Sequence, residues 1–146
     1  VIMKGAITIT KDNRELLLLL LDGIAASEAD ERKRLEELQG EIERATVVES
    51  HLIDADIVTM NSRVSLRDLD SGERVIYTLV YPRDANSAEG RISVLAPVGT
   101  AILGYRVGAT IRWKVPAGER KLRIDKILFQ PEAASDGGKA TGAGPG

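Results

Sequence analysis

Cysteine is absent from the 146 residues of this chain, and histidine occurs once, at His51. Without thiols the chain can form neither a disulfide framework nor a thiolate metal site. A single imidazole also leaves little material for a Ser-His-Asp relay or a histidine-based metal cage. The composition therefore argues against most hydrolase chemistries, and we expect no catalytic residue and no bound metal.

Aromatic residues make up only 3% of the chain, and long apolar runs are missing. So few rings argue against an aromatic-lined ligand pocket or a base-stacking surface. The longest apolar run, Leu16 to Leu21, is far shorter than the roughly 20 residues that cross a bilayer. The charged stretch Lys11 to Glu15 also breaks the pattern of a signal peptide. We expect a cytoplasmic protein that needs no cofactor and contacts no membrane.

Charge is divided unevenly along the chain, although the formal net charge is only -2. Residues 1–50 contain seven Lys and Arg and eleven Asp and Glu, whereas residues 51–146 contain thirteen and eleven. A nucleic-acid-binding domain usually has a dominant basic stripe. This distribution instead favours a protein that binds another protein, and we expect no sequence-specific contact with nucleic acid. We also expect a monomer.

The first 50 residues have the periodicity of two helices. Thr10 or Asp12 is suited to cap the first, apolar character continues to Ala26, and Ser27 is suited to cap the second. We expect a short antiparallel two-helix coiled coil over residues 1–50, with helices of roughly 15 to 19 residues that reach only about 22 to 29 Å. Spacings of three and four residues separate the apolar positions, which are Leu17, Leu20 and Ile24 on the first helix and Leu35, Leu38, Ile42 and Ala45 on the second.

From Ile57 onward, apolar and polar residues alternate with a period of two, which is typical of strands. Pro97 to Gly104 is instead a compact helical turn bounded by glycine. The sequence therefore predicts an α+β fold, with a small antiparallel sheet and one short helix in a second domain at residues 52–131. Residues 132–146 have no large apolar side chain, and we expect a disordered tail.

Four stretches of this second domain carry a resemblance to a known family. They are residues 61–64 (NSRV), 69–73 (LDSGE), 93–99 (SVLAPVG) and 101–108 (AILGYRVG). In this order they resemble the C-terminal domain of the GreA/GreB transcription elongation factors. Residues 58–64 (VTMNSRV), 78–82 (TLVYP) and 129–134 (FQPEAA) are similar in particular to the Rnk proteins of that family, which are named as regulators of nucleoside diphosphate kinase. The resemblance covers residues 52–134.

The resemblance implies an FKBP-like sheet domain with an N-terminal coiled-coil arm that binds RNA polymerase at the mouth of its secondary channel. In Gre factors the arm threads that channel, and acidic residues at its tip help to hold a magnesium ion and water for cleavage of backtracked RNA. Helical reach is proportional to residue count, and the arm expected here is much shorter than a Gre arm. Rnk proteins are likewise short-armed, which implies a regulator that competes with Gre factors without cleaving transcripts.

The first group of candidate residues surrounds Pro97. This proline fixes its own φ and biases Ala96 toward extended geometry, so the turn presents a rigid edge that loses little entropy on docking. In the Gre family the matching loop contacts coiled-coil helices at the channel rim. Exposed Tyr105 and Arg106 are residue types enriched in interface hot spots. The alternative is a plain structural turn beside solvated side chains. The candidate polymerase-binding residues are Leu95, Ala96, Pro97, Val98, Gly99, Tyr105 and Arg106.

The second group is the acidic arm tip, formed by Asp22, Glu28, Asp30 and Glu31. Carboxylates are suitable magnesium ligands, so a Gre-like factor that stimulates transcript cleavage is the alternative function. The competing explanation is that acidic residues in the first turn of a helix are favoured by the helix dipole alone.

Other charged residues have weaker functional interpretations. Arg63 and Arg67 share one strand face and could contact acidic polymerase helices or phosphate, although such a face is usually only solvated. His51 near Asp54 and Asp56 is typical of a linker rather than a metal site. Kinase activity is unsupported because the chain contains no P-loop motif. Prolyl isomerase activity is disfavoured because the chain has too few aromatic residues to line the pocket that it requires. A binding module acting outside transcription is a third class of function.

Overall fold

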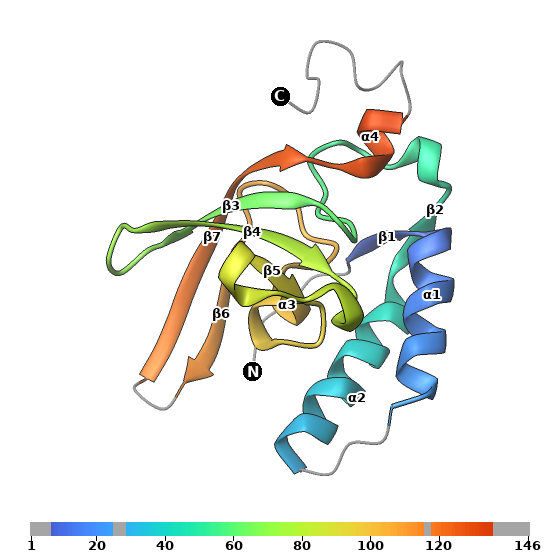
Figure 1. Ribbon diagram of the computed structural model, residues 1–146, viewed down its shortest axis with the longest axis horizontal. Coiled ribbons are helices and arrows are strands. Elements are labelled where there is room, and N and C mark those ends of the chain that lie inside the picture. The colour runs from blue at the N-terminus through green and yellow to red at the C-terminus, as the bar shows by residue number, and fades with distance from the viewer. Residues whose placement is uncertain (1–6, 25–28, 116–117, 136–146) are drawn as a thin grey trace.

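The computed structural model describes residues 7–24, 29–115 and 118–135 and has a mixed α+β architecture, as the sequence predicts (Figure 1). Five strands form one sheet in the order β5-β4-β3-β7-β6, and two short strands form a separate sheet. None of the described helices combines the length and the apolar character that a membrane span requires. The elements are β1 (Thr8–Thr10), α1 (Lys11–Asp22), α2 (Ala29–Arg44), β2 (Thr46–Val48), β3 (Arg63–Asp68), β4 (Arg74–Val80), β5 (Arg91–Ser93), α3 (Pro97–Ile102), β6 (Thr110–Val115), β7 (Gly118–Phe129) and α4 (Pro131–Ser135), with short 3-10 turns at Ser50–Leu52, Pro82–Asp84 and Ser87–Glu89.

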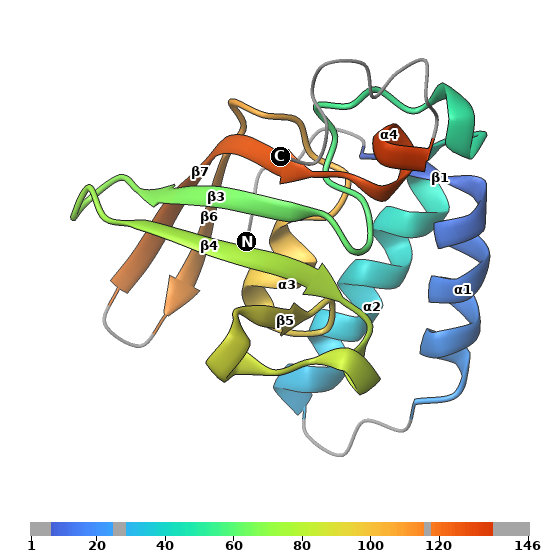
Figure 2. The same ribbon diagram turned by 45° about the horizontal axis from the view of Figure 1, so that its top comes forward.

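The N-terminal arm consists of α1 and α2, which lie side by side (Figures 1 and 2). Thr10 is the N-cap of α1, and its hydroxyl oxygen accepts a hydrogen bond from the backbone N–H of Asn13 at 3.0 Å. The helix ends at Asp22, although the apolar character of the sequence continues beyond it, because Gly23 follows as a C-cap with little helix propensity. With 12 and 16 residues, α1 and α2 are about 18 and about 24 Å long. The predicted cap Ser27 lies outside the described residues.

The base of the arm is a small parallel sheet between β1 and β2. The alternation of residues 7–10 predicts β1, but nothing in the sequence predicts β2. The backbone N–H of Thr46 donates to the carbonyl oxygen of Ile7 at 2.8 Å, and the N–H of Thr8 donates to that of Gly104 at 3.2 Å. The entry to α1 and the exit from α2 are therefore hydrogen-bonded together, and the entry is also hydrogen-bonded to the sheet domain.

One hydrophobic core extends from the arm into the sheet domain. Leu17 of α1 and Leu38 and Ile42 of α2 are almost completely buried. The apolar stripes that predict a two-helix arm thus pack on the sheet domain as well as on each other. Their buried neighbours from the rest of the chain include Val58, Met60, Val64, Leu66, Leu79, Val94, Ile102, Leu103, Ile111, Leu122 and Ile124.

The prediction of a purely antiparallel sheet is wrong at one edge, where β5 pairs with β4 in parallel. A parallel pair needs a crossover rather than a tight hairpin. Residues 81–90 provide it with two 3-10 turns, and Gly90 at φ 76° completes the reversal. The remaining pairs, β3 with β4, β3 with β7 and β6 with β7, are antiparallel as expected.

The end of the sheet domain also differs from the prediction, because α4 occupies part of the expected disordered tail and is a second short helix. The buried side chain of Gln130 fixes its start. Its amide nitrogen donates to the carbonyl oxygens of Asp54 and Ile57, both at 2.8 Å, and its oxygen accepts from the N–H of Ala133. Glu132 accepts a hydrogen bond from the hydroxyl of Thr59 at 2.7 Å. These polar contacts, which composition cannot reveal, order the helix; residues 136–146 lie outside the described part.

Gly104 lies at the junction between the arm and the sheet domain, so a substitution there tests how closely the two pack. It has φ 83°, and a Cβ atom there would lie 2.6 Å from Cβ of Ile7. We predict that Gly104→Ala lowers the free energy of unfolding by about 2 to 4 kcal/mol, since a left-handed backbone and overpacking both carry a cost. Gly72→Ala is the matched control, because Gly72 has φ 79° but a Cβ atom there would have no neighbour within 4 Å, so only the backbone cost of about 1 kcal/mol applies. Urea denaturation measures both; equal losses would contradict the close approach.

Candidate functional site

The loop at residues 95–99 is a rigid turn at the start of α3. Ser93 organises it, because its hydroxyl accepts a hydrogen bond from the N–H of Leu95 and its carbonyl oxygen accepts from the N–H of Ala96, both at 3.0 Å. Ala96 is the extended N-cap, and Pro97 occupies the first turn, where its missing N–H is not needed. The backbone geometry is thus fixed by local hydrogen bonds and by proline.

Gly99 fixes the depth at which α3 sits against β5. A Cβ atom at this position would lie 2.1 Å from the carbonyl oxygen of Ser93, a separation that no side chain tolerates. The hydroxyl of Thr100 donates to the carbonyl oxygen of Val94 at 2.7 Å and holds the helix from its buried side. Of the five predicted contact residues here, Pro97 alone is exposed, Leu95, Ala96 and Val98 are half-buried, and Gly99 is buried.

Arg34 of α2 joins the arm to this loop. Its Nε–H donates to the carbonyl oxygen of Leu95 at 3.0 Å, a contact between residues 61 positions apart. Sequence reasoning missed this residue, because a half-buried arginine on a helix with several charged neighbours carries no distinguishing signal. The loop edge is therefore held by the arm rather than presented on its own.

Tyr105 is oriented differently from the prediction of an exposed hot spot. Its side chain is half-buried, and its hydroxyl is buried without a hydrogen-bond partner among the described residues. Burial raises the pKa of Tyr105 far above 10.0, and the negative charge of Glu41 on α2 raises it further. The ring packs against the hydrophobic core. Tyr105 consequently supports the junction with the arm.

Arg106, by contrast, is exposed as predicted. Its guanidinium lies 2.8 Å from the carboxylate of Asp56 and 3.1 Å from that of Asp54. Exposed ion pairs of this kind contribute little stability, so the arginine can exchange them for a partner's carboxylate at small cost. Asp54 and Asp56, considered with His51 in the sequence, have Arg106 as their cationic neighbour.

The acidic arm tip is only partly described by the structure. Asp22 is exposed at the end of α1, and Glu31 is half-buried in the first turn of α2. Glu28 and the side chain of Asp30 lie outside the described residues. Asp22 also borders an open groove between α1 and α2, a feature that the sequence does not predict, whose other lining residues are Arg14, Glu15, Leu18, Leu19 and Gln39.

A known protein family matches the part of the chain that contains the Pro97 loop, Tyr105 and Arg106. The family model for the C-terminal domain of the GreA/GreB transcription elongation factors matches residues 53–129. The chain belongs to the GreA/GreB family. The matched segment covers β3 to β7 together with the loop around Pro97 and residues Tyr105 and Arg106.

Individual relatives agree with this assignment. The chain is 44% identical over 100 residues to the regulator of nucleoside diphosphate kinase of Escherichia coli K12, an alignment that covers 68% of this chain and 74% of the relative. It is 35% identical over 97 residues to the transcription elongation factor GreA of Trichlorobacter lovleyi, covering 66% and 61%. Thus this chain spans about three fifths of the length of that GreA.

A solved structure has the same fold over most of the chain. It is a GreA/GreB transcription elongation factor from Nitrosomonas europaea, with a TM-score of 0.72 and 36% identity. The alignment covers 86% of this chain and all of the other, so it extends beyond the sheet domain into the arm. The family expectation from the sequence is thereby confirmed.

The hydrogen bond from Arg34 should stabilise the loop measurably. We predict that Arg34→Ala lowers the free energy of unfolding by about 1 kcal/mol, because a hydrogen bond from a charged donor to a half-buried carbonyl oxygen is lost. Arg32→Ala is the control, since Arg32 is exposed one half-turn away on the same helix. Hydrogen exchange of the amides of residues 95 and 96 should accelerate only in the Arg34 variant; unchanged exchange would contradict the coupling.

The buried hydroxyl of Tyr105 predicts that the folded protein loses stability at alkaline pH. In the unfolded chain the phenol ionises at its ordinary pKa of 10.0, whereas in the folded protein it stays protonated to higher pH, so stability falls as pH rises above about 10. We predict that Tyr105→Phe loses less stability than the parent as the pH is raised from about 9 to about 11. Thermal melts across this range measure the difference. At about pH 8 the variant should be as stable as the parent or more stable, because an unpaired buried hydroxyl is removed; a parallel alkaline loss in both proteins would contradict the assignment.

Proposed function

We propose that this chain binds RNA polymerase at the mouth of its secondary channel and competes there with Gre factors without stimulating transcript cleavage. Family membership supports the partner, because the resemblance of the sheet domain to Gre factors implies polymerase binding. The name of its E. coli relative describes a regulator. In this proposal the chain is a monomeric cytoplasmic regulator with no catalytic residue of its own. Its arm is a short coiled coil, and its sheet domain is of the FKBP-like type.

The length of the arm is the observation that carries the non-cleaving part of the proposal. The longer helix, α2, has 16 residues and is about 24 Å long. Moreover, the inner part of both helices packs on the sheet domain through Leu17, Leu38 and Ile42. Only the remainder of the arm is available to extend toward a polymerase active site, so competition through shared binding energy is favoured over metal-assisted chemistry.

The contact surface in this proposal is centred on Pro97. Its ring is exposed while Ser93, Gly99 and Arg34 fix the backbone behind it. A surface whose conformation is fixed before docking loses little entropy when it binds. Arg106 contributes a cation that can move from Asp56 to an acidic partner group. Tyr105 acts indirectly, by holding the chain between these two residues.

We predict that the protein alone releases no cleaved RNA from stalled polymerase complexes but suppresses cleavage stimulated by a Gre factor. Pro97→Ala should weaken this suppression several-fold, because the exposed ring and the rigidity of the turn are lost. Pro82→Ala is the matched control, since Pro82 also begins a short helical turn but lies in the β4–β5 connection. The measurement is the amount of cleaved transcript at increasing protein concentration.

The acidic arm tip is the basis of the alternative function, stimulation of transcript cleavage. If the protein alone produces cleavage that is lost in a variant with Asp22→Asn and Asp30→Asn, the chain is a Gre-like cleavage factor and the competitor proposal is wrong. If neither cleavage nor suppression occurs, the polymerase is not the partner. Equal effects of Pro97→Ala and Pro82→Ala would leave polymerase binding intact but exclude the loop as its contact.

A further inference from the structure

The open face of the five-stranded sheet carries an unexpected concentration of cations. On β3, Arg63 and Arg67 alternate with Val64 and Leu66, which are fully buried in the core. Because successive side chains of a strand point to opposite faces, both arginines lie on the face away from the core. The helices α1, α2 and α3 contribute to the core on the other face, so this side of the sheet is open (Figure 2).

Strand register extends this face across four strands. Arg67 is paired with Arg74 of β4 and with Arg123 of β7. Further along, Arg112 of β6 is paired with Lys121 of β7, and directly paired residues share a face. Lys126 is the partner of outward-facing Ser65. We call this surface the basic sheet face; its cationic residues are Arg63, Arg67, Arg74, Arg112, Lys121, Arg123 and Lys126, and its carboxylates are Glu119 and Asp125.

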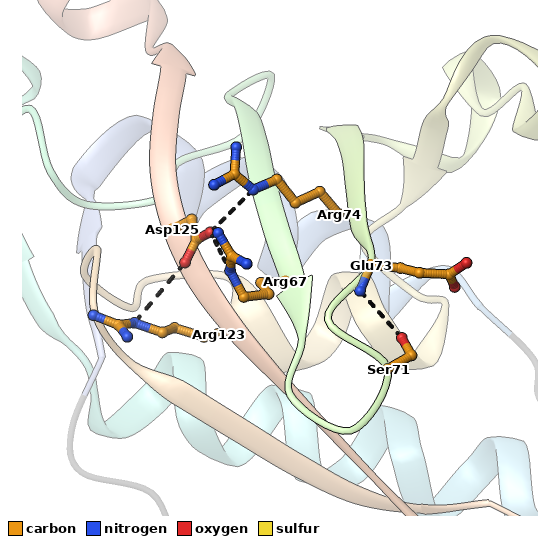
Figure 3. A network of polar contacts seen from close by, with 6 residues as sticks. All are labelled: Arg67, Ser71, Glu73, Arg74, Arg123 and Asp125. Atoms are coloured by element: carbon orange, nitrogen blue, oxygen red, sulfur yellow. Dashed lines mark hydrogen bonds and ion pairs between the residues drawn. The ribbon is translucent and has the colours of Figure 1, made fainter.

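Asp125 organises the centre of the basic sheet face (Figure 3). The register between β3 and β7 shifts at this point, so Asp125 has no directly paired residue on β3. Its carboxylate lies 3.0 Å from Nε of Arg67, 3.8 Å from Nε of Arg74 and 3.9 Å from Nε of Arg123. One negative charge thus orients three guanidinium groups. Arg74 and Arg123 remain more than half exposed, with 56% and 55% of their side-chain surface accessible. The cluster is therefore ordered but retains a positive excess.

This face is basic although the protein is acidic. Among the side chains that the structure describes, this face has seven cations and two carboxylates, while the whole chain has a formal net charge of -2. The rest of the molecule is accordingly rich in negative charge. Neither half of the sequence shows this segregation, because the cations are spread over four strands and alternate with core residues.

The composition of the face distinguishes between two kinds of polyanionic partner. The core of a protein–protein interface is depleted of charged residues and enriched in aromatic and apolar ones. Here Ile76 is the only large apolar side chain exposed on β3, β4, β6 or β7 within the described part of the chain. Interfaces with nucleic acid are instead polar and strongly positive. Cations in neighbouring strands about 4.8 Å apart and at alternate residues about 6.7 Å apart suit a continuous line of negative charge.

We propose that the basic sheet face binds the phosphate backbone of nucleic acid, independently of base sequence. This function goes beyond polymerase binding and does not require it. It is also compatible with the expectation that the chain makes no sequence-specific contact, since phosphate contacts carry no sequence information directly. Arginine predominates over lysine on the face, and its planar guanidinium binds phosphate oxygens in a bidentate manner.

The test is fluorescence anisotropy of the full chain with short labelled single-stranded DNA, single-stranded RNA and duplex DNA, each in two unrelated sequences. We expect dissociation constants on the order of 10⁻⁴ to 10⁻⁶ M, with little difference between sequences and weakening from about 50 to about 200 mM salt. A variant with Arg63→Gln, Lys121→Gln and Lys126→Gln retains Asp125 and its three arginines. Because each phosphate contact contributes about 0.9 to the slope of log affinity against log salt for duplex DNA, this variant should reduce the slope by about 2 to 3.

The matched control is Arg32→Gln, Lys33→Gln and Arg44→Gln, which removes three exposed cations from α2. It should bind like the parent, whereas an equal loss would show that net charge alone attracts the nucleic acid and would overturn the proposal. Absence of binding at about 50 mM salt would overturn it too. Competition by polyglutamate as strong as by unlabelled DNA would assign the face to an acidic polypeptide instead. Thermal melts of each variant confirm that the fold is retained.

Discussion

The close approach of Gly104 to the first strand is the constraint on which the architecture depends. The backbone at Gly104 accepts a hydrogen bond from Thr8 of β1 and donates one to the carbonyl oxygen of Val58. It thereby joins the arm, the segment before β3 and the end of α3 at one position. A Cβ atom there would lie 2.6 Å from Cβ of Ile7, so the absence of a side chain allows the start of the arm to pack directly against the sheet domain.

The same junction explains how the candidate site is built. Immediately before Gly104, α3 leads back to Pro97, and immediately after it the chain places Tyr105 inward and Arg106 outward. Arg34 approaches the loop from α2 and fixes its edge. The residues most suited to contact a partner are therefore supported by the arm as well as by the sheet, and a change in the packing of α2 would be transmitted to the loop.

Local signals in the sequence predict most helices and strands, whereas contacts between distant segments cannot be predicted from such signals. Thr10 as a cap, the leucine spacing and the two-residue alternation of β3, β6 and β7 all reflect interactions between near neighbours. The parallel β5, the strand β2 and the hydrogen bond from Arg34 depend instead on which distant segments meet. Tyr105 was expected at the surface because tyrosine is enriched in interface hot spots, but its ring packs against the core. The basic sheet face was hidden for a related reason, since only strand register places Arg67, Arg74 and Arg123 together.

The separation of the basic sheet face from the acid-rich arm has a consequence for how the molecule approaches any charged surface. In Figure 1 the arm lies at one side and the hairpin ends of the sheet at the other. A molecule whose opposite charges are separated in this way has an electric dipole moment even though its net charge is small. In the field of a highly charged assembly it experiences a torque as well as a force, so collisions occur preferentially in one orientation. Rotational alignment of this kind precedes contact and is weakened as added salt shortens the range of the field.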